Sequence, residues 1–305
     1  MKPVLATASL AALLAATLAA CSRDEPAPVT TAKPVAAAAI PSPPPPPPAP
    51  PVAKDKYAPL MQAVFGDAYR SAEGNALADL PDETDANAVF TAVQTGAASL
   101  RLPSGETVLA VAGERADADG KAASAHASSG NLSLYLLRQE GGHWQVLRRH
   151  ENIAQLGSFG NIGKLGWITQ PGGKVLLTAE HGGTWQGYTI GILSLFDPTA
   201  DKVTDLARDI PIHSTSGGGC GPTTEHCWDI AAKWRFEPAA TPGAYDDLVL
   251  AFAGEDETAK KGAPPPKDEM EGIERDRREV AGTARYVFED GKYVLRQGEN
   301  LVPGI

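Results

Sequence analysis

The stretch Ile190-Gly191-Ile192-Leu193-Ser194-Leu195-Phe196 is apolar on both of the faces that a β-strand would present. Because alternate residues of a strand point to opposite faces, the isoleucines and Phe196 would lie on one face and the leucines on the other. Residues 248–252, Leu-Val-Leu-Ala-Phe, repeat this pattern. Strands of a sheet with one wet face should instead alternate apolar and polar residues. We therefore expect antiparallel sheets covered on both faces, arranged like the blades of a β-propeller or, alternatively, as a β-sandwich.

Turn-forming residues separate short apolar runs throughout the chain after residue 85, which is typical of β-hairpins. About six such turns predict about twelve strands. Before them, residues 57–70 carry apolar side chains at helical spacing, with Pro59 suited to a first helical turn. The sequence thus predicts one all-β domain over 55–305 with one short N-terminal helix. The turns are Pro103-Ser104-Gly105, Gly141-Gly142, Pro171-Gly172-Gly173, Asp197-Pro198, Pro242-Gly243 and Asp290-Gly291.

Residues 255–279 interrupt this pattern, because they combine three consecutive prolines with a dense mixture of acidic and basic side chains. We expect a charged, solvated loop there, between the last strands of the domain.

The N-terminus has the features of an export signal. Lys2 is followed by an apolar run over 4–20 that ends in small residues. The four residues Leu18-Ala19-Ala20-Cys21 resemble the lipobox of bacterial lipoproteins. That resemblance implies a signal peptide over 1–20, acyl chains on Cys21, and, with Ser22 after the cysteine, a protein anchored in the Gram-negative outer membrane with its domain facing the periplasm. An ordinary secretory signal cut after Ala20, or a short retained anchor helix, are the alternatives.

Proline dominates the segment that follows the cysteine, and residues 43–48 are all proline. Such a segment favours extended polyproline geometry and cannot bury a core. We expect residues 21–54 to be a disordered linker, acting either as a stalk or as a spacer with no length requirement. Use as a ligand for a proline-binding module is a third, less favoured interpretation.

The domain also carries a family resemblance over about residues 130–300. Its strand and turn segments are similar to those of degenerate FG-GAP-type β-propeller domains, at GSFG 157–160, HGGTWQGY 181–188, YDDLVL 245–250 and YVFEDGKY 286–293. The calcium-binding loops of those repeats are missing, and only Asp246 and Asp247 resemble part of them. Calcium binding is therefore not implied.

Cys220 and Cys227 are the two cysteines left once Cys21 is acylated. A pair of cysteines in an exported protein predicts a disulfide, which here would order a glycine-rich loop. A zinc site that adds His213 and His226 is the alternative, although the spacing departs from the usual zinc pattern.

The segment 181–188 is the strongest candidate for ligand binding. His181, Trp185 and Tyr188 lie among glycines, and stacking aromatic rings with a few polar groups are typical of sugar- or peptide-binding sites. Alternatively, the two aromatic residues belong to the core of the strand that continues into Ile190. The glycines at 157, 160 and 163 lack the setting of a dinucleotide-binding loop and are interpreted as turns.

The net charge of −10 disfavours nucleic acids as partners, since these need a basic surface. No nucleophile elbow, phosphate-binding loop or metalloprotease motif occurs, so no catalytic residue, metal ligand or cofactor is predicted. We expect a non-enzymatic β domain that binds an envelope protein or a cell-wall glycan. A periplasmic hydrolase with an active site built from loops is the alternative.

Overall fold

The computed structural model describes residues 55–82, 85, 87–199, 202–240, 245–265, 267 and 271–304. All of them belong to one compact unit, Val52–Ile305. The predicted signal peptide over 1–20, the predicted acylation site Cys21 and the predicted linker over 21–54 lie outside the described residues.

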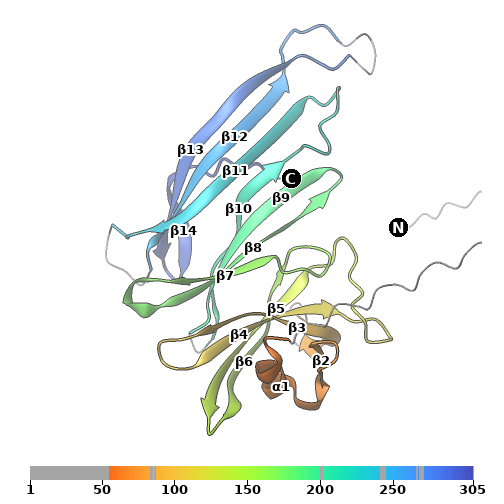
Figure 1. Ribbon diagram of the computed structural model, residues 1–305. Helices are drawn as coiled ribbons and strands as arrows, with labels where there is room; N and C mark the ends of the chain where they lie inside the picture. The colour runs from red at the N-terminus through yellow and green to blue at the C-terminus, as the bar shows by residue number, and fades with distance from the viewer. Residues whose placement is uncertain are drawn as a thin grey trace, which may run out of the picture. The chain divides into compact units, whose positions relative to one another are not determined.

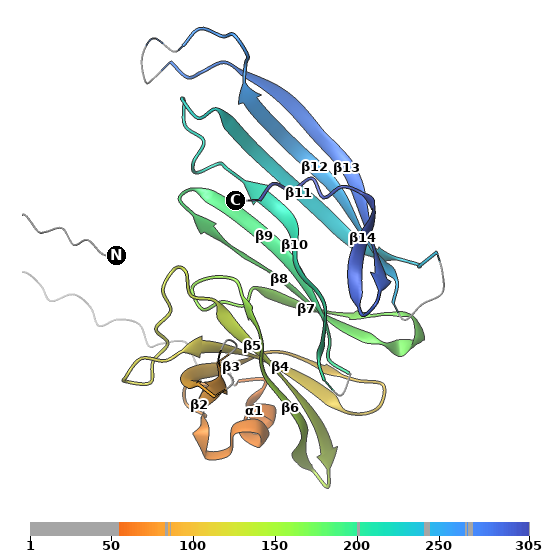
Figure 2. The ribbon, with the colours of Figure 1, turned by 180° about the vertical axis from the view of Figure 1, so that it is seen from behind.

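Two antiparallel sheets make up most of the unit, and in each sheet the strand order follows the chain (Figures 1 and 2). The six-stranded sheet contains β1 (Tyr69–Arg70), β2 (Asn75–Pro81), β3 (Val89–Arg101), β4 (Thr107–Arg115), β5 (Gly130–Glu140) and β6 (His143–Leu156). The eight-stranded sheet contains β7 (Lys164–Thr169), β8 (Val175–Trp185), β9 (Tyr188–Asp197), β10 (Thr204–Thr215), β11 (His226–Glu237), β12 (Asp247–Ala259), β13 (Arg275–Glu289) and β14 (Lys292–Gly298).

The predicted all-β class, the antiparallel pairing and the single short helix are confirmed. The strands form two large meanders that do not close into a barrel, in place of the four-stranded blades of a propeller. The reason is that nearly every turn leads the chain into a strand that pairs with the preceding one, so each sheet grows by successive hairpins. Five of the six predicted turns separate strands, and Pro242-Gly243 lies outside the described residues.

The helix α1 (Ala58–Phe65) has Pro59 in its first turn and is followed by the capping residue Gly66, whose φ of 53° few other residues adopt. It is shorter than the predicted 57–70, because a turn of 3₁₀-helix, η1 (Gly66–Ala68), and then β1 follow directly. A second 3₁₀ turn, η2 (Pro171–Gly173), joins β7 to β8.

The middle of the six-stranded sheet is buried on both faces. On one face, Met61 of α1 packs in a cluster with Leu109 and Tyr135. On the other face, Leu134 packs in a cluster that also contains Leu177 of β8 and Phe196 of β9. One face is thus covered by the helix and the other by strands of the second sheet. The predicted two-faced run that ends at Phe196 belongs to β9 of the other sheet, and it contributes Leu195 to one apolar cluster and Phe196 to another.

The eight-stranded sheet builds its own core by folding over itself. β10 and β11 pair at only three positions, His213–Thr215 of β10, so their remaining lengths diverge. The core contains Leu195 from the β7–β10 half and Leu250 from the β11–β14 half. The C-terminal segment lies against β10, where the amide of Asn300 donates to the carbonyl oxygen of Pro211 at 3.0 Å.

The charged loop predicted over 255–279 is shorter than expected, which corrects that boundary. β12 continues to Ala259 and β13 begins at Arg275, so only residues 260–274 lie between the strands. The density of charged residues suggested a solvated loop, but charges of opposite sign pair across the neighbouring strands. Arg277 contacts Glu255, and Arg278 Nη2 lies 2.8 Å from Asp256 Oδ2.

Candidate ligand-binding groove

An apolar groove of about 560 Å³ lies at the tip of the β8–β9 hairpin, and we call it the aromatic groove. Its lining residues are Trp185, Gln186, Tyr188 and Trp228. Two of the three predicted ligand-binding residues, Trp185 and Tyr188, therefore lie together at one hollow. The volume falls in the range of sites that hold small molecules.

The hairpin turn places two of these rings side by side. Gln186 and Gly187 both have positive φ, 51° and 87°, as the two-residue turns that suit the twist of a hairpin require. Trp185 and Tyr188 are consequently cross-strand partners at the end of the hairpin. The indole of Trp185 lies over Gly183, where a Cβ atom would approach the ring to 2.4 Å. A glycine at that position is needed for the ring to lie flat.

A stack of three aromatic rings continues from Trp185 onto neighbouring loops. The ring of His126 is 6.0 Å from Trp185 and 4.6 Å from Phe159, and all three are nearly parallel. Phe159 is 60% exposed, an unusual position for a phenylalanine in a stacked group. The stack therefore presents an aromatic face to solvent.

A second aromatic group lines the other side of the groove. The ring of Trp228 lies 5.6 Å from Tyr188 and 4.9 Å from His226. Its indole Nε1 donates to Ser214 Oγ at 2.8 Å, and its backbone N–H donates to Ser216 Oγ at 2.8 Å. Both serines are fully buried, so the orientation of Trp228 is fixed from beneath.

The predicted disulfide is present and braces the groove. Cys220 and Cys227 are bonded, with their Cα atoms 5.6 Å apart. The disulfide closes a loop over residues 220–227, and the segment just before that loop reaches the hairpin tip, where the N–H of Gly218 donates to the carbonyl oxygen of Gly187 at 3.0 Å. Arg275 of β13 holds the same loop, because its guanidinium donates to the carbonyl oxygens of Gly221 and Thr224 at 2.6 Å.

His181, the third predicted ligand-binding residue, is not among the lining residues of the groove. Its Nδ1 accepts from the N–H of Gly157 at 3.2 Å, so in the neutral ring Nε2 carries the proton and donates to Ser194 Oγ at 3.0 Å. Burial lowers the pKa of His181 below its usual value, against an opposing effect of Asp209. The neutral ring joins β8 to β9 and to the loop after β6.

The two histidines of the zinc alternative are each engaged with a carboxylate. His213 Nε2 lies 3.3 Å from Asp229, and His226 Nε2 lies 2.6 Å from Asp256. Burial would raise the pKa of Asp256, but hydrogen bonds from His226 and Arg278 hold it below its usual value. Within the described ranges, no group of three or more His, Cys, Asp or Glu side chains is placed to hold a metal ion.

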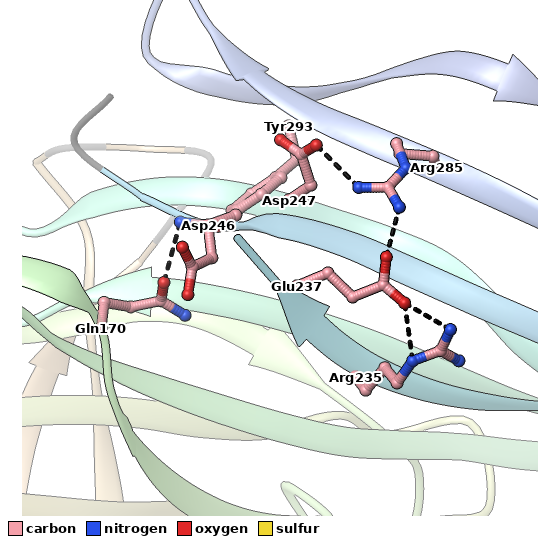
Figure 3. A network of polar contacts seen from close by, with 7 residues as sticks. All are labelled: Gln170, Arg235, Glu237, Asp246, Asp247, Arg285 and Tyr293. Carbon is pink, nitrogen blue, oxygen red and sulfur yellow. Dashed lines mark hydrogen bonds and ion pairs between the residues drawn. The ribbon is translucent and has the colours of Figure 1, made fainter. Parts of the chain in front are cut away.

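Asp246 and Asp247, the two acids that resemble part of a calcium-binding repeat, belong to a polar network. This network lies at the end of β11–β13 that is away from the aromatic groove (Figure 3). Arg285 Nη1 donates to the buried Asp247 at 2.9 Å, and its other nitrogen contacts Glu237. The N–H of Asp246 donates to Gln170 Oε1 at 2.9 Å. An arginine thus balances the charge of Asp247.

Sequence reasoning missed half of the groove. Gln186 was not predicted as a ligand-binding residue, and Trp228 lies 40 residues beyond Tyr188 in the chain. The one available signal was that Trp228 directly follows Cys227, so that a disulfide ordering its loop would also position the indole. His126 and Phe159 lie in loops without any ligand-binding pattern.

Comparisons with protein-family models, with curated proteins and with solved structures find no match for this chain. Among the helices that the structure describes, none is both long and apolar enough to cross a membrane.

Proposed function

We propose that the chain is an envelope lipoprotein whose β domain binds a cell-wall glycan in the aromatic groove. The observation that carries this proposal is the groove itself, where Trp185, Tyr188 and Trp228 line one apolar hollow. Sugar rings have apolar faces that pack on aromatic rings, and hydroxyl groups at their edges that need polar partners.

The groove offers such partners beside its rings. The indole N–H of Trp185 and the hydroxyl of Tyr188 make no hydrogen bond to any other residue in the part of the chain that the structure describes. Gln186 adds an amide with both donors and an acceptor. A glycan can therefore stack on the rings and bond at their edges without displacing an existing contact.

The anchor is proposed on the lipobox resemblance alone. In this proposal, Cys21 carries acyl chains and the protein is held at the outer membrane, facing the periplasm where the glycan lies. Replacing Cys21 with Ala should abolish incorporation of a labelled fatty acid and release the protein from the membrane fraction. Labelling that persists in the variant would contradict the anchor.

Two binding measurements test the groove. One is cosedimentation with purified peptidoglycan, and the other is tryptophan fluorescence during titration with soluble glycan strands. Trp185→Ala should weaken binding by at least about tenfold, because a central stacking ring is lost. Trp144→Phe is the matched control, since Trp144 belongs to β6 in the other sheet and packs on the core there. Equal losses in both variants would contradict the proposal.

The same incubation separates binding from the hydrolase alternative. Glycan strands recovered after binding should keep their length distribution, because the lining of the groove contains no pair of carboxylates of the kind that most glycosidases use. Shortened strands would favour the hydrolase.

A further inference from the structure

A second hollow, of about 540 Å³, lies between the two sheets, and we call it the intersheet cleft. β6 contributes His150 and Ile153 to its lining, while Phe196 comes from β9, Val203 from the position just before β10, and Asp205 from β10. The cleft shares no lining residue with the aromatic groove. It is therefore a separate site.

Two polar atoms of the lining are shielded from solvent and lack a hydrogen-bond partner among the described residues. They are Nε2 of His150 and Oδ1 of Asp205. A buried polar atom without a partner is costly, and such atoms in folded proteins are generally satisfied by water or by a ligand. Two of them at one hollow indicate that its occupant supplies hydrogen bonds.

The second carboxylate oxygen of Asp205 is already held. Arg208 Nε lies 2.6 Å from Asp205 Oδ2, and Arg208 Nη2 donates to the carbonyl oxygen of Ile153 at 2.7 Å. The carboxylate is thus fixed between the sheets, and its remaining oxygen can accept a donor from an occupant.

The charges that line the cleft balance one another, which favours an uncharged occupant. Glu151 and Asp205 are acidic, while Lys202 and Arg208 are basic. Burial lowers the pKa of His150, as does the charge of Arg148, so its imidazole is neutral at pH 7. The lining therefore has no excess charge of either sign to attract a charged occupant.

The rest of the lining includes the apolar side chains of Ile153, Phe196 and Val203. An occupant must therefore combine apolar surface with hydroxyl or amide donors, at a size that suits about 540 Å³. Small sugars and cyclic polyols have these properties.

We propose that the intersheet cleft binds a neutral polyhydroxy compound of mono- or disaccharide size. One hydroxyl group donates to Asp205 Oδ1, and another is bonded to His150 Nε2. This site does not depend on the aromatic groove, so either proposal can fail without the other.

The test follows the imidazole resonances of the full-length protein, labelled with isotope-enriched histidine, during titration with glucose, N-acetylglucosamine and myo-inositol. The His150 resonances should move with at least one of these neutral probes at millimolar concentration. Glucosamine and glucuronate, which carry opposite charges, should bind more weakly than the neutral probes.

Two variants assign the effect to the cleft. Asp205→Ala should weaken binding by at least about tenfold, because a charged acceptor is lost. Since that change also removes the ion pair of Asp205 with Arg208, Val203→Trp is the second variant. It fills the cleft and should abolish binding while circular dichroism stays unchanged. Trp185→Ala, in the aromatic groove, should leave the titration unaffected.

Each opposite result would overturn the proposal. If no neutral probe moves the His150 resonances, the two polar atoms are satisfied by water alone. Tighter binding of a charged probe would contradict the charge balance, and binding that survives Val203→Trp would place the sugar elsewhere.

Discussion

The six-stranded sheet and the groove end of β11–β13 (residues 226–229, 255–259 and 275–279) are stabilised by different interactions. In the six-stranded sheet, Leu134 and Leu109 are buried on opposite faces, beneath the second sheet and beneath the helix. At the groove end, by contrast, most side chains are at least partly exposed, and cross-strand ion pairs and the disulfide replace apolar packing. A region that does not need its side chains for a core can present them to a ligand.

The largest effect is expected from the core of the six-stranded sheet. Leu134→Ala should lower the free energy of unfolding by about 2 to 5 kcal/mol, because it leaves a cavity between the sheets. Urea unfolding measures this loss. Leu147→Ala, at a position 38% exposed on β6, should change it by no more than about 0.5 kcal/mol. Similar losses in the two variants would contradict the contrast between buried and exposed positions.

At the groove end, the disulfide should have the next largest effect. Replacing Cys220 and Cys227 together with Ser opens a loop of eight residues, and the chain-entropy model puts the loss at about 2.5 kcal/mol. Because Cys220 follows the segment that contacts Gly187 and Cys227 directly precedes Trp228, both sides of the groove become less constrained, and glycan binding should weaken as well. Adding a reductant to the unmodified protein should reproduce both changes, and retained binding would show that the loop does not brace the groove.

His181 should make the junction between the sheets sensitive to acid. Its pKa is lowered in the folded protein, so the unfolded chain, with a histidine pKa of about 6.5, takes up the proton first. The stability that the neutral ring provides is therefore present above about pH 6.5 and lost as the pH falls, by at most about 1.4 kcal/mol per pH unit.

Urea unfolding at pH 7 and at pH 5 measures this slope. His181→Gln should flatten it, whereas His143→Gln, at an exposed position on β6, should leave it unchanged. A slope that persists in His181→Gln would assign the acid sensitivity to other groups.

The smallest effect is expected from the ion pairs of the groove end. Arg278→Ala removes the contact with Asp256, but the Arg278 side chain is 76% exposed, so the loss should be about 0.2 to 1 kcal/mol. The difference from the unmodified protein should shrink in high salt, which screens exposed charges. A loss as large as that of Leu134→Ala would mean that this end depends on its ion pairs as strongly as the core depends on packing.

Much of the fold could be predicted because it depends on local patterns. The two-faced apolar run that ends at Phe196 predicted sheets covered on both sides, and five of the six turn sequences are seen to separate strands. The hairpin at Gln186-Gly187 was missed, because glutamine seldom adopts the positive φ that it has there. The length of β12 and β13 was missed for another reason: their charges are stabilising only when the strands are paired.

The candidate site shows the same division. The segment 181–188 was singled out by its residue types, which did not distinguish a half-buried structural histidine from two aromatic residues of a groove. Only the register of β8 against β9 sets His181 apart from Trp185 and Tyr188. Trp228 joins them through the disulfide loop, which no pattern within the segment could reveal.

By itself, the sequence determined the β class, the short helix, the covered faces and the pairing of Cys220 with Cys227. These follow from the period of apolar residues, from turn chemistry and from the number of cysteines, all of which act over short stretches of chain. Tertiary structure alone decided that the strands form two meanders, that Trp228 faces Tyr188, and that His150 and Asp205 line one cleft. Those arrangements depend on strand register and on contacts between residues far apart in the chain, which a local pattern does not encode.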